Sequence, residues 1–441
     1  MIYKDSSISW IGQIPIHWNT LSVSKAYQVT LGKMLQPNSN NENDVKTPYL
    51  KAMNVQDGYI SLEKIDEMYC SANELKMLNL EVSDLVVCEG GEVARSAVVK
   101  EKLEGFIFQN SVHRVKSSEK GNTRFLHYLL IVLRASGFIN ILVNKATIAH
   151  FTKDKFNSLK IALPPLNEQI VISNYLDIKY DEVEILIKNK QKLITLLEQQ
   201  RQSIITEAVT KGLNSNVKMK ESGVEWIGEI PEHWEVRKIK DVGNVYSSNV
   251  DKKSVEGEKE VLLCNYVDVY YNDSITVNLD FMKATAKVDQ IKIFTLKKHD
   301  VIITKDSESP TDIAIPTWVS QDLDGVVCGY HLSLIRCAES VLGHYLYYAL
   351  ESVQIREQFY TRANGVTRYG LSKEAIKNGL IAVPPYNEQL QIAEKLYADN
   401  KEIRDMTEKV KAQIEKLKEY RQALIYEAVT GKIDVREMEI D

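Results

Sequence analysis

An internal repeat constrains the fold of this 441-residue chain more than any other feature of its sequence. Residues 10–18 (Trp-Ile-Gly-Gln-Ile-Pro-Ile-His-Trp) return as residues 226–234, with seven of nine positions identical. The motif Pro-Pro-x-Asn-Glu-Gln at residues 164–169 returns at residues 384–389. A third match, which begins with Arg-Gln and ends with Glu-Ala-Val-Thr, joins residues 201–210 to residues 421–430. A repeat of this length indicates two copies of one structural unit.

The segments between these motifs barely match. Residues 19–160 and 235–380 share only weak correspondences, such as residues 83–87 with 299–303, or His113 with His331. Two similar frames with different interiors suggest a protein that holds two distinct recognition surfaces in a fixed relation. The alternative is that the interiors of an old duplication have drifted without functional meaning.

Each Pro-Pro pair is followed by a segment that favours a long helix. Proline cannot continue a helix from its interior, asparagine is a good N-cap, and glutamate is stabilised in a first turn by the helix dipole. Glycine commonly ends a helix. The pattern predicts N-caps at Asn167 and Asn387, first-turn acids at Glu168 and Glu388, and helix ends near Gly212 and Gly431.

Apolar residues recur every three or four positions along both helices, as in a coiled-coil seam. The predicted seam positions are Val183, Leu186, Leu193, Leu197 and Ile204 in the first copy and Ile403, Met406, Val410, Leu417, Tyr420 and Leu424 in the second, with polar interruptions at Lys190, Gln200 and Gln413. A helix of about 42 residues is roughly 60 Å long, too long for a small domain to cover. The two copies are therefore expected to pack on each other; separate packing of each helix on its own half is the alternative.

The repeated Trp-Ile-Gly-x-Ile-Pro-x-His-Trp segment contains the pairs His17-Trp18 and His233-Trp234. A metal or catalytic role would need further ligands or acids at suitable spacing, which the sequence lacks. We therefore expect an anchor, in which the tryptophans supply buried area and the glycine and proline shape a turn.

Composition excludes several classes of protein. The chain is 44% hydrophobic and 26% charged, which is ordinary for a globular protein. Its longest mainly apolar stretch, residues 126–133, is too short to span a membrane, and residues 1–5 do not resemble a secretion signal. The 5 cysteines contain no Cys-x-x-Cys pair, which argues against disulfides and structural zinc and favours the cytoplasm.

The formal net charge of −5 does not itself indicate a nucleic-acid partner, so any such function must depend on local patches. Two segments at matching places are basic. Residues 145–160 contain four lysines and one aspartate, and residues 362–377 contain two arginines, two lysines and one glutamate. Each segment therefore carries a charge of +3 and lies just before its Pro-Pro pair.

The order of these motifs, repeated over nearly the whole chain, resembles the DNA specificity subunit of Type I restriction-modification systems. The resemblance implies an α/β (α+β) fold in which two mixed target recognition domains are separated by two long helices packed as an antiparallel coiled coil, with a pseudo-twofold internal repeat. The implied domains are residues 1–162 and 214–382 for recognition and residues 163–213 and 383–441 for the spacer helices.

The same resemblance implies the function and the partners. Each recognition domain would read one half of an asymmetric, split site in double-stranded DNA, and two methyltransferase subunits would bind the helices. These partners would carry S-adenosylmethionine and methylate adenine N6, while restriction subunits would cleave unmodified DNA. No cofactor or metal is expected in this chain, and no membrane partner.

The basic segments supply the candidate DNA-binding residues, because arginine and lysine contact guanine edges or phosphates, asparagine pairs with adenine, and hydroxyl groups serve either role. The candidates are Asn144, Lys145, Thr147, His150 and Lys153 in the first half, and Arg362, Asn364, Thr367, Arg368, Tyr369 and Lys373 in the second. A turn at residues 89–92 adds Arg95 as a weaker candidate. The aligned residues His113 and His331 are expected to serve the shared fold.

Two other functions remain as alternatives. Val383-Pro384-Pro385-Tyr386 resembles the catalytic box of amino-methyltransferases, whose first residue must accept a hydrogen bond from the target amino group. Valine cannot accept one, and no glycine-rich turn for a nucleotide-like cofactor follows a strand elsewhere. The remaining alternative is a coiled-coil scaffold that does not contact DNA.

Overall fold

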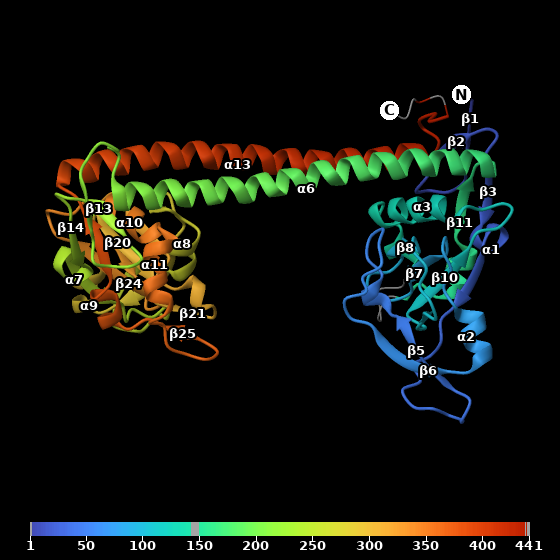
Figure 1. Ribbon diagram of the computed structural model, residues 1–441, viewed down its shortest axis with the longest axis horizontal. Helices are drawn as coiled ribbons and strands as arrows, with labels where there is room; N and C mark the ends of the chain where they lie inside the picture. The colour runs from blue at the N-terminus through green and yellow to red at the C-terminus, as the bar shows by residue number, and fades with distance from the viewer. Residues whose placement is uncertain (1, 143–149, 437, 439–441) are drawn as a thin grey trace. The chain divides into compact units, whose positions relative to one another are not determined.

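The computed structural model describes residues 2–142, 150–436 and 438. The chain forms two compact units, the first made of Met1–Lys190 with Ala412–Asp441 and the second of Gln191–Lys411. Two long helices, α6 (Leu166–Lys211) and α13 (Tyr386–Val429), each contribute to both units (Figure 1). In the part of the chain that the structure describes, no helix is long and apolar enough to cross a membrane.

The first unit combines small sheets with short helices. Its largest sheet has the antiparallel order β4-β10-β7-β8, and a second has the order β6-β5-β9. The strands are β1 (Tyr3–Asp5), β2 (Gln13–Pro15), β3 (Asn19–Ser22), β4 (Gln28–Leu31), β5 (Val45–Leu50), β6 (Asp66–Cys70), β7 (Leu85–Cys88), β8 (Ser96–Val98), β9 (Ile107–Phe108), β10 (Val112–Lys116) and β11 (Lys160–Leu163). The helices are α1 (Val23–Ala26), η1 (Ala52–Asn54), α2 (Ala72–Leu78), α3 (Thr123–Ala135), α4 (Ile139–Leu142) and α5 (Lys153–Ser158).

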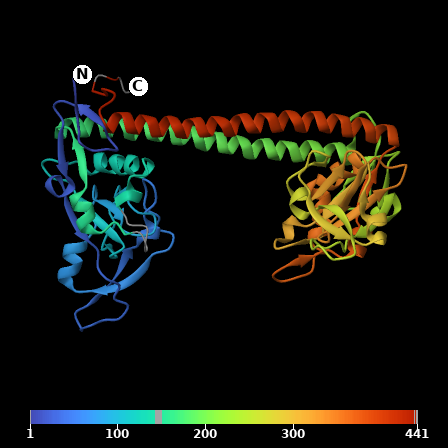
Figure 2. The same ribbon diagram turned by 180° about the vertical axis from the view of Figure 1, so that it is seen from behind.

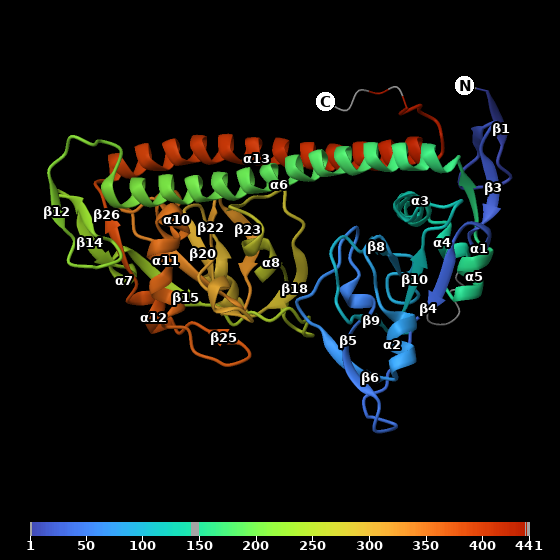
Figure 3. The same cartoon turned by 45° about the vertical axis from the view of Figure 1, so that its right-hand side comes forward.

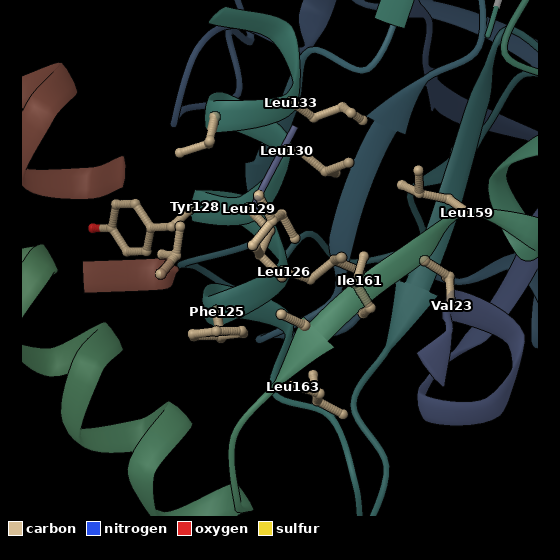
Figure 4. Close-up of a cluster of buried hydrophobic side chains, with 14 of the residues drawn as sticks. Val23, Phe125, Leu126, Tyr128, Leu129, Leu130, Leu133, Leu159, Ile161 and Leu163 are labelled. Atoms are coloured by element: carbon tan, nitrogen blue, oxygen red, sulfur yellow. The ribbon is translucent and has the colours of Figure 1, made fainter. Parts of the chain in front are cut away.

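The core of the first unit forms around α3. The side chain of Asn122 caps this helix by accepting hydrogen bonds from the backbone N–H groups of Arg124 and Phe125. Leucines of α3 point toward β11, where Ile161 and Leu163 are buried, whereas Tyr128 points the opposite way and its hydroxyl donates to the Asp177 carboxylate of α6 (Figure 4). The same cluster includes residues from the start of α6 and the end of α13, so burial of apolar area joins the long helices to this unit.

The second unit has a five-stranded sheet in the order β15-β24-β20-β22-β17 and a four-stranded sheet in the order β18-β16-β23-β19. Its strands are β12 (Met219–Glu221), β13 (Glu229–Pro231), β14 (Glu235–Lys238), β15 (Gly243–Ser247), β16 (Lys259–Cys264), β17 (Ser274–Ile275), β18 (Met282–Ala286), β19 (Thr295–Leu296), β20 (Asp300–Thr304), β21 (Asp306–Ser307), β22 (Pro316–Val319), β23 (Leu323–Cys328), β24 (Leu332–Cys337), β25 (Tyr369–Gly370) and β26 (Leu380–Val383). Its helices are α7 (Ile239–Val242), α8 (Tyr266–Tyr270), α9 (Val288–Phe294), η2 (Pro310–Asp312), α10 (Gly343–Glu351), α11 (Val353–Tyr360) and α12 (Lys373–Lys377).

The weak correspondence between the two interiors reflects a shared central strand. In the first unit β7 pairs with β10, and in the second β20 pairs with β24 in the same antiparallel way. Shortly before each central strand the backbone is left-handed, with φ of 73° at Ser83, two positions before β7, and 69° at His299, directly before β20. Ala94 and Ala314 repeat this at 61° and 58°. The two interiors are therefore variants of one fold.

The starts of the long helices differ from the prediction in one respect. Helices α6 and α13 begin at Leu166 and Tyr386, so Asn167 and Asn387 lie inside the first turn and are not N-caps. The Pro165 carbonyl accepts from the backbone N–H groups of both Glu168 and Gln169, which places the helix start two residues earlier than an N-cap at Asn167 would. The predicted ends hold, since Gly212 and Gly431 follow the helices with φ of 77° and 69°.

The long helices pack antiparallel, as the resemblance implied. In the first unit Lys190 donates to the Gln413 side chain at 2.6 Å, and Glu184 forms an ion pair with Arg421, so residue numbers rise along α6 as they fall along α13. Figure 2 shows these two segments side by side. In the second unit the end of α6 and the start of α13 share one core cluster.

The heptad spacing is confirmed, but part of the predicted seam is wrong. The buried seam residues of the helices include Val183, Ile187, Leu197 and Ile205 in α6 and Ile403, Val410, Ile414 and Leu424 in α13. Leu186 and Leu193 are 47% and 42% exposed, and Met406, Tyr420 and Gln200 are also exposed. These residues are adjacent to the seam on the helix surface, because the partner helix covers a stripe narrower than the apolar pattern.

The tryptophan segment is an anchor, as predicted, and its partner is the start of the long helix. Trp18 Nε1 donates to the Glu168 carboxylate at 3.0 Å, and His17 Nε2 lies 2.9 Å from the other oxygen. In the second unit Trp234 and His233 contact Glu388 in the same way, at 2.9 and 2.7 Å. In each unit, therefore, the His-Trp pair of the tryptophan segment binds the glutamate of the Pro-Pro-x-Asn-Glu-Gln motif.

Candidate DNA interface

The basic segment before each Pro-Pro pair is tied to the carboxyl end of the central strand. Phe151 N–H donates to the Glu89 carbonyl at 2.7 Å in the first unit. Leu371 N–H donates to the Lys305 carbonyl at 2.7 Å in the second unit. The shared frame thus presents two different loops at one equivalent place, where the sequence predicted the DNA-facing residues.

We call these two backbone hydrogen bonds, Phe151 to Glu89 and Leu371 to Lys305, the tethers of the two loops. The aligned histidines lie beside the tethers but have different surroundings. His113 is fully buried, its Nε2 lies 2.9 Å from the Phe151 carbonyl, and burial lowers its pKa. His331 is only half-buried and lies 3.2 Å from the Asp306 carboxylate and 2.9 Å from Arg368 Nη2. Burial also lowers the pKa of His331, so its neutral ring can accept a hydrogen bond from arginine.

The second unit presents its candidate residues on a closed loop. Asn364 and Gly370 exchange two backbone hydrogen bonds of 3.0 and 2.9 Å, and β25 pairs with β21 at the end of the loop. Gly365 has φ of 149°, and a Cβ there would lie 1.9 Å from the Arg368 carbonyl oxygen, so only glycine fits. Val366 is 91% exposed at the tip of this loop.

The structure brings four of the predicted residues together on that loop. Asn364, Thr367 and Arg368 are exposed, and Tyr369 is half-buried in β25. In Figures 1 and 3 the loop lies on the side of the second unit that faces away from α6 and α13. A surface of this kind is accessible to a large partner such as a duplex.

Two other candidates of the second unit lie on either side of the loop. Arg362 donates to the Asn378 carbonyl at 3.3 Å, and the Lys373 ammonium lies 5.9 Å from the ring centre of Tyr246. Arg362 is half-buried and is held by this contact, whereas Lys373 is exposed at the start of α12.

In the first unit the predicted residues are divided. Asn144, Lys145 and Thr147 lie outside the described residues. His150 is exposed, and its ring packs above Gly90, where an added Cβ would lie 3.6 Å from His150 Nδ1. Lys153, half-buried, is the first residue of α5.

Arg95 is held inside the first unit. Its Nη2 donates to the Ala52 carbonyl at 3.0 Å, its Nη1 lies 3.7 Å from the Glu92 carboxylate, and its side chain is mostly covered. These contacts give Arg95 a structural role in positioning the turn at residues 89–92.

Sequence reasoning missed the group of tyrosines next to Arg368. Tyr266, Tyr270 and Tyr271 lie on or beside α8 and line a cavity of about 420 Å³ that also reaches His331 and Arg368. The close spacing of these aromatic residues was the only signal in the sequence, and α8 is separated from residue 368 by almost 100 positions.

Comparison with known proteins settles the family. The family model for the Type I restriction modification DNA specificity domain matches residues 16–197 and again residues 231–416. These two matches include the His-Trp end of each anchor, both interiors and most of both long helices. The chain belongs to this DNA specificity family. The family model is matched twice, in agreement with the internal repeat.

Individual relatives agree with this membership. The Type I restriction enzyme MjaVIII specificity subunit of Methanocaldococcus jannaschii is 24% identical over 429 residues, which cover 97% of this chain and 95% of the relative. The fold is also similar to a chain from a study of complex assembly and conformational transition in the type I R-M system, with a TM-score of 0.71, 14% identity, and coverage of 95% of this chain and 99% of that one. The HsdS subunit of Thermoanaerobacter tengcongensis has a TM-score of 0.52 and 17% identity, with coverage of 95% and 98%.

Proposed function

We propose that the chain is the DNA recognition subunit of a Type I restriction-modification complex and reads an asymmetric, two-part target, one half-site with each unit. One observation carries this proposal: a single frame is repeated, while the groups at the end of its central strand differ. His113 is buried beneath Phe151 in the first unit, whereas His331 contacts Arg368 in the second. Two similar frames that carry different surfaces are suited to reading two different half-sites.

The bases would be read mainly from the two tethered loops. In the second unit the proposed contacts are Asn364, Thr367, Arg368 and Tyr369, with Arg362 and Lys373 at the flanks. In the first unit they are His150 and Lys153, together with Asn144, Lys145 and Thr147. We assign Arg95 a weaker part, because its guanidinium is already engaged by Ala52 and Glu92.

The chain recognises and does not catalyse, in keeping with relatives named as specificity subunits. Val383 is the last residue of β26 and is buried, and Pro384 and Pro385 lead into α13, so this motif serves as a helix start. A methyltransferase box would require an accessible polar acceptor at that position, which makes the enzyme alternative incompatible with the fold of this motif.

Two methyltransferase subunits would bind the long helices and supply S-adenosylmethionine, and restriction subunits would complete the complex. In the first unit Ile185 and Leu186 of α6 and Tyr420 of α13 are exposed, and exposed apolar side chains of this kind support a protein partner there. The proposed domains are residues 1–162 and 214–382 for recognition and 163–213 and 383–441 for the helices. The cytoplasm, where the DNA is, is the expected compartment.

Methylation sequencing of DNA from cells that express the chain with its methyltransferase subunit tests the proposal. We expect a motif with two different short half-sites separated by unread bases. A continuous palindromic motif would contradict the assignment of one half-site to each unit.

The variants Arg368→Ala and Arg368→Lys then separate base reading from phosphate binding. If the guanidinium makes a bidentate contact with guanine, both variants relax one half-site by about 1 to 3 kcal/mol, because lysine cannot reproduce the planar contact. If it binds phosphate, Arg368→Lys keeps affinity and both half-sites stay intact. The other half-site serves as the internal control.

A further inference from the structure

The cavity beside the loop of the second unit combines aromatic and charged groups. It has a volume of about 420 Å³ and lies between α8, the segment from β21 to η2, and Arg368. The aromatic and charged groups that line it include Tyr266, Tyr270, Glu308, Asp312, His331 and Arg368. All of them belong to the second unit.

The tyrosines form a fixed wall. Tyr266 and Tyr270 are one helical turn apart on α8, and their rings stack with centres 5.6 Å apart and an angle of 18° between the planes. Tyr271 contacts Tyr270 edge to face at 5.1 Å. Aromatic side chains exclude water from nearby polar groups, which strengthens hydrogen bonds made in the cavity.

The carboxylates of Glu308 and Asp312 line the cavity and form no ion pair within the described residues. The Asp306 carboxylate is engaged, since it lies 2.9 Å from the Lys305 ammonium and 3.2 Å from His331. Among the described residues, by contrast, no ion pair involves Glu308 or Asp312, and the Asp312 carboxylate has the Tyr270 hydroxyl as a hydrogen-bond neighbour. Ser309 caps η2 through the Thr311 N–H, and the Asp312 carbonyl accepts from the Thr304 hydroxyl at 2.8 Å, so the backbone that carries these acids is fixed.

Carboxylates on a DNA-facing surface have few favourable partners. Phosphates repel them, and the major-groove atoms of guanine, together with thymine O4, are hydrogen-bond acceptors. The exocyclic amino groups, N4 of cytosine and N6 of adenine, are the donors that a carboxylate can bind. Acids beside an arginine that is suited to guanine thus have the chemistry to read neighbouring base edges.

We propose that Glu308 and Asp312 accept a hydrogen bond from the exocyclic amino group of one cytosine or adenine, in the half-site that the second unit reads. This inference rests on the proposed function and adds residues that lie outside the basic loop. Arg368 and the tyrosine wall would place the base edge within reach of the two acids.

The test uses the complete complex of the chain with its methyltransferase subunits and a duplex that carries the methylated motif. At each position of both half-sites, a cytosine is replaced by 2-pyrimidinone or an adenine by purine, because each analogue lacks only the amino group. We expect one position to lose about 5- to 150-fold in affinity with the wild-type complex. The identity of the base at that position distinguishes cytosine from adenine.

The variants Glu308→Ala and Asp312→Ala, which remove the acceptor oxygens, should make that position insensitive to the analogue, so that removal of the amino group changes affinity less than twofold. Glu308 is exposed, so its replacement leaves the core intact. Glu339→Ala is the matched control, since Glu339 is an exposed acid of the same unit that does not line the cavity, and it should keep the full loss.

The two hypotheses fail in different ways. A wild-type complex that shows no preference for any two-part duplex refutes the proposed function. A wild-type complex that prefers such a duplex, with both acidic variants still sensitive to every amino-group removal, overturns the role of Glu308 and Asp312 alone.

Discussion

Replacing Glu168 by alanine removes the acceptor that joins the first anchor to α6. Trp18 is 1% exposed, and its indole N–H donates to Glu168 Oε1 at 3.0 Å. The Glu168 side chain is itself only 11% exposed, so water has little access to the donor after the change. Glu168→Ala therefore leaves a buried N–H without a partner and also frees His17.

The expected loss follows from these contacts. A buried donor without an acceptor costs about 1 to 3 kcal/mol, and the contact with the more exposed His17 contributes less than about 1 kcal/mol. Together they predict a loss of about 1 to 4 kcal/mol. The first unit has 190 residues from the start of the chain and 30 from its end, a size at which each kcal/mol lowers Tm by about 2 to 4 °C. We expect Tm of this unit to fall by about 2 to 16 °C.

Differential scanning calorimetry, with hydrogen exchange of peptides that contain Trp18 or Trp234, measures the effect in each unit. Glu168→Gln keeps an acceptor for the indole N–H and should cost less than about 1 kcal/mol. Glu388→Ala makes the matching change in the second unit. Its effect should be smaller, because Glu388 is more exposed and water can replace the lost oxygen. An unchanged Tm in Glu168→Ala, or an equal loss in Glu168→Gln, would refute the reasoning.

Two further predictions concern stability. Gly431→Ala should destabilise the first unit by about 2 to 5 kcal/mol in denaturant titration, because its left-handed backbone disfavours a side chain and the added Cβ would lie 2.4 Å from Pro15. Gly12→Ala, with φ of 75° and open space around it, should cost only about 1 to 2 kcal/mol, and equal losses would exclude the contact as the cause. Burial lowers the pKa of His127 to about 4, so protonation favours the unfolded chain, and stability that is complete above about pH 6.5 should decline toward pH 4 by up to roughly 3 kcal/mol. The variant His127→Gln should flatten that pH dependence in unfolding titrations, and an unaltered slope would contradict it.

The sequence predicts the frame well because the frame depends on local rules. Proline pairs exclude helix on one side, glycines end helices, and heptad spacing indicates a partner helix. It is harder to predict which residues of the seam are buried, because burial depends on which stripe of the helix surface the partner helix covers. Leu186 and Leu193 have the right spacing and remain exposed, whereas Ile187, one position away, is buried.

The roles of Glu168 and Gln169 show a second limit. Glu168 was predicted to act only through the helix dipole, yet it binds Trp18, 150 positions away. Gln169 is fully buried, its Oε1 accepts from Asn122 N–H at 2.8 Å, and its Nε2 donates to the carbonyls of Lys120 and Pro164 at 2.8 Å. Such pairings depend on tertiary structure, and only the repetition of the motif signals that they exist.

The same reasoning explains which parts of the two interiors could differ. Trp18 must keep Glu168, because its indole N–H is buried and would otherwise lack an acceptor, and Trp234 makes the same pairing with Glu388 in the second unit. At the end of the central strand, only one backbone hydrogen bond to the loop must be kept, and it does not depend on a particular side chain. A buried His113 can hold that tether in one unit, while in the other a half-exposed His331 contacts Arg368. Buried polar pairs thus fix the frame, and the recognition surface can change without disturbing them.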